Sequence, residues 1–240
     1  MRASPRRTGR WQGGIQYAAR AGMLAALGLA GSVWAAHPVI SADGAARPVI
    51  SADAATLLRW VAASGNNAGA PFMIIDKRHA RVWVFDARAS LQDSAPALLG
   101  LAAGDDSVPG IGTRPVHSIQ PSERTTPAGR FVVHGGHNTS GEDIVWIDYD
   151  AAVSMHRVRP TDPRERRLER LASPSARDNR ITYGCINLPP AFYEQQVKPR
   201  FFSKPGIAYV LPETRPLREV FGLAPRHNPA LARPSPSKSV

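Results

Sequence analysis

The chain is 240 residues long and 43% of its residues are hydrophobic, which suits one sizeable folded domain and excludes a wholly disordered protein. Its 30 basic and 19 acidic residues give a net charge of +11. Because no basic face with interleaved aromatic residues stands out, we expect no nucleic-acid partner. The charge fits attraction to an anionic envelope polymer at least as well.

The first 36 residues have the character of a secretory signal peptide. Five arginines and no acidic residue precede an apolar run from Ala21 to Trp34, which is followed by the small residues Ala35 and Ala36. The run has 14 residues, short of the roughly 20 that cross a bilayer. We therefore expect residues 1–36 to be cleaved and the mature protein to lie in the periplasm or cell envelope, with no stable membrane span. An uncleaved N-terminal anchor is the alternative.

Residues 37–70 are expected to form a linker and a short helix. The hexapeptide Pro38–Asp43 recurs as Pro48–Asp53, a duplication to which we assign no catalytic role. Apolar residues at helical spacing predict an amphipathic helix over 51–63, and a run rich in Gly and Asn at 64–69 ends it.

Short apolar segments separated by Gly and Pro predict a mainly β domain over residues 71–212, a β-sandwich or open barrel with one or two short helices. The clearest signal is a hairpin over 72–85 with a polar turn at 76–80. Further strands are expected at 130–133, 143–147, 151–155 and 206–211, an exposed charged helix at 162–171 and a stronger helix at 190–197. Residues 213–240 are expected to be an extension that is disordered towards its end.

Cys185 is the only cysteine. Exported proteins usually carry cysteines in disulfide pairs, so a single one is buried and inert, bonded to another chain, or a reactive thiol. It lies in the run Thr182–Asn187, just before the helix expected at 190–197, whose N-terminus favours a thiolate. Gly184 has no Cβ and admits close approach of a substrate carbonyl, and the backbone N–H groups around Tyr183, Gly184 and Cys185 are candidate oxyanion donors.

The run Thr182-Tyr-Gly-Cys-Ile-Asn187 resembles the signature of L,D-transpeptidase catalytic domains, whose usual form is Ser/Thr-His-Gly-Cys-apolar-Arg/Asn. Thr126-Pro-Ala-Gly129 before Phe131 resembles that family's Thr-Pro-x-Gly-x-Phe segment, and residues 72–85 resemble its opening hairpin. The likeness covers residues 71–211. It implies a mainly β fold and a peptidoglycan enzyme. Such an enzyme attacks the amide between the third and fourth residues of a stem peptide, releases D-Ala and passes the thioester to an amine or to water.

The resemblance also implies a histidine base upstream of the cysteine. His156, at the end of an apolar strand, is the match, while His134 and His137 are competitors that otherwise have surface or structural roles. An imidazole suits both uptake and delivery of a proton near neutral pH. A backbone carbonyl such as that of Arg157 is expected to hold its other ring nitrogen.

The remaining expectations concern binding. Three residues are expected to contact the substrate: Thr126, Arg180 and Asn187. Peptidoglycan stem peptides are the expected partner, with an envelope protein as an alternative acceptor. No cofactor or metal is expected, because the His-x-x-His pair at 134–137 lacks a third ligand at convincing spacing.

The chain departs from the family pattern in two places. Tyr183 stands where the family usually has His, and 28 residues separate His156 from Cys185, a longer span than usual. The extra stretch around 164–170 is a lid or an insertion, or it indicates that His156 is the wrong match. Two alternative functions follow from the same motif: an L,D-carboxypeptidase with the same site, or a catalytically inactive cell-wall-binding protein.

Overall fold

The computed structural model describes residues 48–223. The expected signal peptide at 1–36, the first copy of the duplicated hexapeptide and residues 224–240 of the extension expected at 213–240 lie outside the described residues. None of the described helices is long and apolar enough to cross a membrane.

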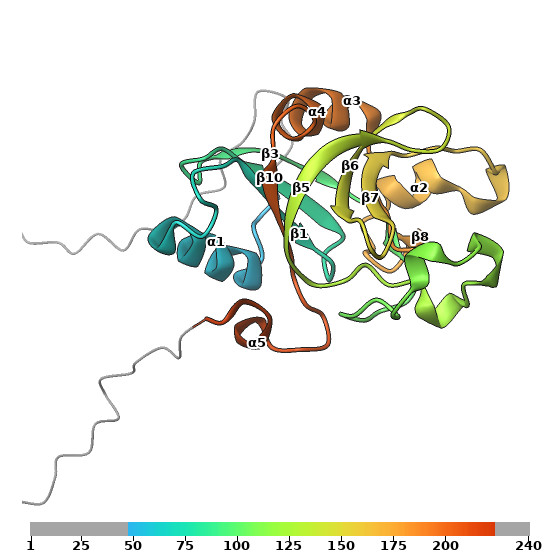
Figure 1. Cartoon of the computed structure of the whole chain (residues 1–240), viewed down its shortest axis with the longest axis horizontal. Coiled ribbons are helices and arrows are strands. Elements are labelled where there is room, and N and C mark those ends of the chain that lie inside the picture. Colours follow the sequence, from blue (N-terminus) through green and yellow to red (C-terminus); the bar gives the residue numbers. More distant parts are fainter. Residues whose placement is uncertain (1–47, 224–240) are drawn as a thin grey trace, which may run out of the picture. The chain divides into compact units, whose positions relative to one another are not determined.

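Most of the strands belong to one sheet of eight, in the order β3-β2-β1-β10-β5-β6-β7-β9 (Figure 1). In chain order these strands are β1 (Phe72–Asp76), β2 (Arg81–Phe85), β3 (Leu91–Pro96), β5 (Gly129–His137), β6 (Asp143–Asp148), β7 (Val153–Arg157), β9 (Ile186–Leu188) and β10 (Gly206–Val210). Two neighbouring pairs, β1 with β10 and β7 with β9, are parallel. A second, two-stranded sheet pairs β4 (Leu99–Gly100) with β8 (Arg180–Thr182).

The two edges of the larger sheet meet next to the expected site. Leu98, two residues after β3, exchanges two hydrogen bonds of 2.9 Å with Asn187 of β9. Because β3 and β9 are the outer strands of the sheet, this bridge nearly closes it into a barrel and covers its edges. The mainly β, open-barrel fold predicted from the sequence is confirmed.

Side chains alternate between two apolar cores, as the period of a strand requires. In β1, Met73 and Ile75 face the first core, whereas Phe72 and Ile74 face the second. The first core is completed by a continuous helical segment made of α3 (Pro190–Phe192), a π-helical turn (Tyr193–Val197) and α4 (Lys198–Phe201). This segment follows β9 directly and packs over the strands that carry the expected site.

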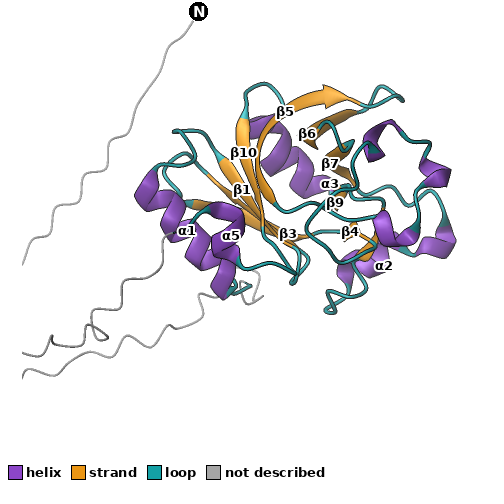
Figure 2. Ribbon diagram, turned by 60° about the horizontal axis from the view of Figure 1, so that its bottom comes forward, coloured by secondary structure: helices purple, strands orange, loops and turns teal. Residues whose placement is uncertain are grey.

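The second core is covered by α1 (Ala52–Ser64) and α5 (Leu217–Phe221), which lie side by side in Figure 2. Helix α1 begins at Ser51, whose hydroxyl accepts the N–H of Ala54 at 3.2 Å, and ends at Gly65 in the left-handed conformation. The second copy of the hexapeptide therefore supplies a helix cap. The packing of α1 and α5 makes the folded unit wider than the expected 71–212.

The structure differs from the predicted elements mainly in length. The hairpin over 72–85 and the helix at 51–63 are confirmed within a residue or two. Strand β5 is longer than the expected 130–133, because residues 134–137 pair with β6. The helix expected at 162–171 is a 3-10 turn (Pro163–Glu165) followed by α2 (Arg167–Ala172), and the helix expected at 190–197 continues to 201. The short strands β3, β4, β8 and β9 have no clear sequence signal. Three further 3-10 turns, Ile111–Thr113, Val116–Ser118 and Pro121–Glu123, lie between β4 and β5.

Candidate active site

Cys185 lies in the tight connection between β8 and β9. The hydroxyl of Thr182, the last residue of β8, accepts the N–H of Gly184 at 3.1 Å and donates to the carbonyl oxygen of Cys185 at 2.6 Å. These two bonds fix the turn and present the thiol at the start of β9. The parallel register pairs Met155 with Ile186, so Cys185 comes to lie beside Ser154 of β7.

Gly184 is required by the backbone around it. Its φ is +124°, and a Cβ there would lie 2.6 Å from the carbonyl oxygen of Thr125. Its N–H is already bonded to Thr182, so Gly184 does not offer the free oxyanion donor that the sequence suggested. Within residues 48–223, the N–H groups of Tyr183 and Cys185 have no hydrogen-bond acceptor, so these two are the groups available to an oxyanion.

Thr126 holds the same turn from a neighbouring segment. It is fully buried, and its hydroxyl donates to the carbonyl oxygen of Gly184 at 2.8 Å and accepts the N–H of Gly100 at 2.9 Å. A fully buried hydroxyl that already donates its only hydrogen does not reach the cavity of Cys185. The expected substrate contact at Thr126 is therefore replaced by a supporting role.

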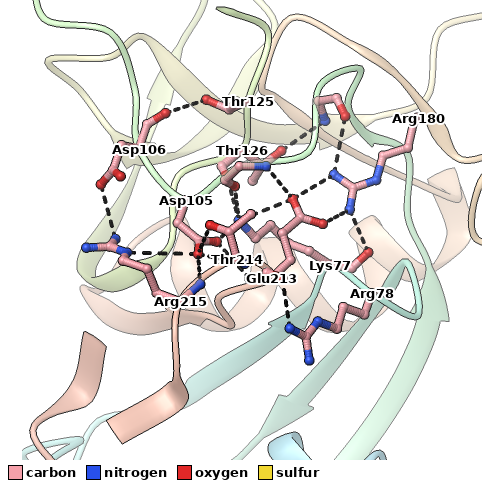
Figure 3. A network of polar contacts seen from close by, with 12 residues as sticks. Lys77, Arg78, Asp105, Asp106, Thr125, Thr126, Arg180, Glu213, Thr214 and Arg215 are labelled. Carbon is pink, nitrogen blue, oxygen red and sulfur yellow. Dashed lines mark hydrogen bonds and ion pairs between the residues drawn. The ribbon is translucent and has the colours of Figure 1, made fainter. Parts of the chain in front are cut away.

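Thr126 is in turn anchored by a buried polar network (Figure 3). The ammonium of Lys77 donates to the carbonyl oxygen of Thr126 and to the carboxylate of Asp105, both at 2.9 Å, and lies 3.5 Å from the carboxylate of Glu213. Arg180 pairs with Glu213 and donates to the carbonyl oxygen of Lys77 at 3.0 Å. Because the Arg180 side chain is only 15% exposed and is bonded within this network, the expected substrate contact at Arg180 is also corrected.

The protonation of this network follows from burial and hydrogen bonding. Burial lowers the pKa of Lys77, although the hydrogen bond to Asp105 and the charges of Glu213 and Asp105 act in the opposite direction. Burial alone would raise the pKa of the Asp105 carboxyl. Hydrogen bonds from Thr214, Lys77 and the backbone N–H groups of Glu213 and Arg215 outweigh it and hold that pKa far below the usual range. Asp105 is thus a firmly ionised anchor.

The thiol of Cys185 is half-buried, with two Ser154 groups and one carbonyl oxygen around it. The N–H of Ser154 lies 3.5 Å from Sγ, the Ser154 hydroxyl 3.6 Å from it, and the carbonyl oxygen of Ala152 3.8 Å from it. Burial disfavours the thiolate and by itself raises the pKa of the Cys185 thiol. The hydrogen bond and charge of His156, followed by the two Ser154 donors, outweigh burial, so this pKa lies below that of an ordinary cysteine.

His156 is held on β7 by both ring nitrogens. Nδ1 lies 2.8 Å from the carbonyl oxygen of Arg157, the contact expected from the sequence, and Nε2 lies 3.0 Å from the amide nitrogen of Asn187. Asn187 is 1% exposed and its amide faces the imidazole. The structure therefore makes Asn187 a partner of His156, whereas the sequence suggested a substrate contact.

Two cavities meet at His156. The first, about 430 Å³, is lined by Cys185, Tyr183 and His156 among others. The second, about 750 Å³, is lined by Ser154, His156 and the aromatic rings of Trp146 and Tyr149. His156 and Arg159 line both cavities. A molecule in either cavity can therefore approach the same imidazole.

The competing histidines are placed differently. His134 is exposed on β5, and His137 packs edge-on against Phe202 with ring centroids 5.7 Å apart. His137 lines only the second cavity, so His156 is the one of the three that shares a cavity with Cys185. Within the described part of the chain, no group of three or more His, Cys, Asp or Glu side chains is arranged to hold a metal ion.

Tyr183 occupies the position of the family's usual histidine as part of a stacked pair. Its side chain borders the Cys185 cavity and is 38% exposed, and the guanidinium of Arg124 lies 3.8 Å from the centre of its ring. A cation at this distance is attracted by the aromatic face. The pair places an aromatic ring on the cavity wall with the positive charge of Arg124 against its face.

Sequence reasoning missed several residues of the site, among them Ser154 and Arg167. Ser154 has a recognisable signal, since it lies two residues before His156 in a strand and must face the same side. Arg167 of α2, which lines the Cys185 cavity, lies in a run of alternating charges and has no signal that separates it from its neighbours.

Comparisons with known proteins find a few solved structures that are weakly similar to this chain. No family model matches the chain, and no curated protein matches it. Among solved structures, the helical cell shape determining protein Pgp2 from Campylobacter jejuni is 13% identical with a TM-score of 0.37, over 61% of this chain and 49% of that one. This chain thus spans about half the length of the Pgp2 structure.

Two further structures are similar to the same degree. A fused Zn-dependent amidase/peptidase/peptidoglycan-binding domain-containing protein from Clostridium acetobutylicum is 15% identical with a TM-score of 0.34, over 68% of this chain and 65% of that one. The catalytic domain of an L,D-transpeptidase from E. faecium is 14% identical with a TM-score of 0.30, over 58% of this chain and 95% of that one. Similarity this low transfers no activity, which has to follow from the chemistry of the site.

Proposed function

We propose that this chain is an exported L,D-transpeptidase of the cell envelope that acts on peptidoglycan stem peptides through a Cys185 thioester. The observation that carries the proposal is the shared cavity of Cys185 and His156, with a thiol pKa below the ordinary value and an imidazole held by both ring nitrogens. A thiol next to a fixed imidazole is the arrangement of a cysteine acyltransferase.

In the first step, Sγ attacks the carbonyl carbon between the third and fourth residues of a stem tetrapeptide. The Asn187 amide gives up its contact with Nε2 of His156, the thiol proton passes to that nitrogen, and the N–H groups of Tyr183 and Cys185 donate to the oxyanion. The C–N bond then breaks, and the proton held by His156 goes to the departing amine of D-Ala. The products are a thioester on Cys185 and free D-Ala.

In the second step, an amine attacks the thioester carbonyl. His156 takes the proton from the amine, the S–C bond breaks and the proton returns to Sγ. Two cavities that meet at one imidazole support this two-substrate scheme, because the acyl donor and the acceptor each need access to it. The acceptor is a second stem peptide or an envelope protein. Water in its place gives a carboxypeptidase with the same residues.

Arg159 is the proposed substrate contact in place of Thr126 and Arg180. It lines both cavities, its side chain is 38% exposed, and its partner Glu142 is a surface carboxylate. An exposed guanidinium paired with a surface carboxylate can exchange that partner for the terminal carboxylate of a stem peptide and bind it as a bidentate pair.

The test is mass spectrometry of purified tetrapeptide muropeptides incubated with the mature protein and with the Cys185→Ala variant. Loss of D-Ala with the intact protein and none with Cys185→Ala is the expected result, with both proteins unfolding at the same temperature. Crosslinked dimers indicate transfer, and tripeptide monomers indicate hydrolysis. If the intact protein gives neither product, the proposal fails and a wall-binding role is favoured, with Tyr183→His as the variant to test for restored turnover.

A further inference from the structure

Ser154 of β7 contacts the reacting sulfur from outside the cysteine motif. Its backbone N–H lies 3.5 Å from Sγ of Cys185, and its hydroxyl oxygen lies 3.6 Å from the same atom. Ser154 is 6% exposed, and within residues 48–223 its hydroxyl has no hydrogen-bond partner other than Sγ. This hydroxyl is therefore placed to serve the chemistry of the sulfur and no other group of the described chain.

The direction of this hydrogen bond is fixed whenever the sulfur carries negative charge. A thiolate has no hydrogen and only accepts, so the hydroxyl of Ser154 has to donate. The carbonyl oxygen of Ala152, 3.8 Å from Sγ, is itself only an acceptor and cannot stabilise that charge. Ser154 thus offers the sulfur two donors, and substitution of the side chain removes the hydroxyl while the backbone N–H stays.

The two steps of the proposed reaction use the hydroxyl unequally. In the first step it stabilises the attacking thiolate itself, and the bond weakens as negative charge leaves the sulfur. In the thioester the sulfur is neutral, and charge returns to it only as the S–C bond breaks and leaves its electron pair on sulfur. Because only an interaction that is stronger in the transition state than in the ground state accelerates a step, the hydroxyl favours the second step. A more acidic thiol is likewise a poorer nucleophile and a faster leaving group.

We infer that Ser154 is a catalytic residue of the transfer step, in which its hydroxyl donates to the sulfur that departs from the thioester. The inference rests on the proposed function, which supplies the thioester. After the S–C bond has broken, the sulfur takes the proton that His156 removed from the acceptor amine, so the Ser154 hydroxyl stabilises a transient charge and loses no proton itself.

The test measures the two steps separately. A stem tetrapeptide with acetylated amines is the acyl donor, because it forms the thioester but cannot accept it, and release of D-Ala reports the first step. Unblocked tetrapeptide is then added, and loss of the acyl mass from the intact protein by mass spectrometry reports the second step. In Ser154→Ala we expect the second rate to fall about tenfold, as for the loss of a hydrogen bond to a charged group. The first rate should change by no more than about threefold, so the thioester accumulates.

Two further variants make the comparison specific. Ser154→Thr keeps the hydroxyl, suits a strand, and places its extra methyl group next to the cavity of about 750 Å³ that Ser154 lines, so we expect it to retain the second rate. Ser94→Ala is the matched control, because it removes a strand hydroxyl that bonds to Arg81 at 3.2 Å and lines neither cavity. It should leave both rates unchanged.

Three outcomes would overturn the inference. They are an unchanged second rate in Ser154→Ala, an equal fall of both rates in that variant, and a second rate as slow in Ser154→Thr as in Ser154→Ala. The last two would give Ser154 a structural role, which the unfolding temperatures of the variants check.

A simple acyl donor keeps this test separate from that of the proposed function. If the unmodified protein forms no thioester with the tetrapeptide, the proposed function fails. p-Nitrophenyl acetate, which acetylates thiolates, then supplies the thioester, and comparison with Cys185→Ala identifies the acetyl group on the sulfur. Slower transfer of that acetyl group to glycinamide in Ser154→Ala than in the unmodified protein supports the role of the hydroxyl, and equal rates overturn it.

Discussion

Two polar clusters contact the turn that carries Cys185, and they differ in how far their polar groups are buried and hydrogen-bonded. The network of Lys77, Asp105, Glu213 and Arg180 is closed: the Lys77 side chain is 0% exposed, that of Asp105 1% and that of Glu213 7%. The cluster around Cys185 is open, since its thiol and imidazole line a cavity and two N–H groups have no acceptor within residues 48–223.

The difference separates what holds the site from what reacts in it. A buried charge costs several kcal/mol unless it is paired and hydrogen-bonded, so each member of the closed network needs its partners in place. Lys77 donates a hydrogen bond to the carbonyl oxygen of Thr126, and the Thr126 hydroxyl donates one to the carbonyl oxygen of Gly184, so the network supports the turn before Cys185. The open cluster keeps unfilled bonding capacity for a substrate. Substitutions in the two clusters should therefore have different signatures, one in stability and the other in chemistry.

The largest expected effect is on the closed network. Lys77→Met leaves the buried carboxylate of Asp105 without its cation, and we expect the free energy of unfolding to fall by about 3–5 kcal/mol. Urea unfolding followed by circular dichroism measures it. Lys198→Met is the control, since Lys198 is 41% exposed and pairs with Asp143 at 3.4 Å, and a surface pair of this kind contributes about 0–1 kcal/mol. Equal losses in the two variants would mean that burial gives Lys77 no special weight.

Thr126→Val tests the link between the two clusters. The variant keeps the shape of the side chain but leaves the N–H of Gly100 and the carbonyl oxygen of Gly184 without partners. We expect a loss of about 1–3 kcal/mol in stability. We also expect a loss of D-Ala release at temperatures where the protein is still folded, because the turn before Cys185 loses its anchor. Thr126→Ser keeps the hydroxyl and should retain both properties; full turnover in a destabilised Thr126→Val would break the link.

The fold was predictable where the sequence pattern is local. The hairpin over 72–85 alternates strictly between the two cores, and α1 begins at a serine that caps it, so period and capping chemistry suffice. The strands β8 and β9 have three residues each and exist because they pair with β4 and β7, which lie far away in the sequence. Such strands depend on tertiary pairing, which no local propensity records.

The candidate site likewise contains residues that local sequence identifies and residues that only the tertiary fold places. Cys185 and His156 follow from a motif and from residue chemistry, and the hydrogen bond from the imidazole to Arg157 was expected from the sequence. The placement of Thr126 and Arg180 could not be predicted in this way, because burial decides whether a polar side chain meets substrate or its own protein. Arg167 could not be singled out either, since it is one of several arginines in a charged stretch and only the fold brings it to Asn187.

The smallest expected effect is a shift in the reactivity of Cys185 with pH. Iodoacetamide reacts with the thiolate, so a thiol pKa below the ordinary value, about 8.5, places the midpoint of the rate-against-pH curve below that of a free cysteine. His156→Gln removes the main groups that lower this pKa, so its midpoint should move to higher pH, towards or beyond that of free cysteine, as burial still acts. A midpoint that does not respond to His156→Gln would contradict the assigned cause.

Lys77→Met, studied where it is still folded, should leave the midpoint in place, because the closed network contacts the turn through Thr126 and not through the thiol. If that midpoint moves as well, the two clusters are one electrostatic unit, and the distinction between support and chemistry has to be given up.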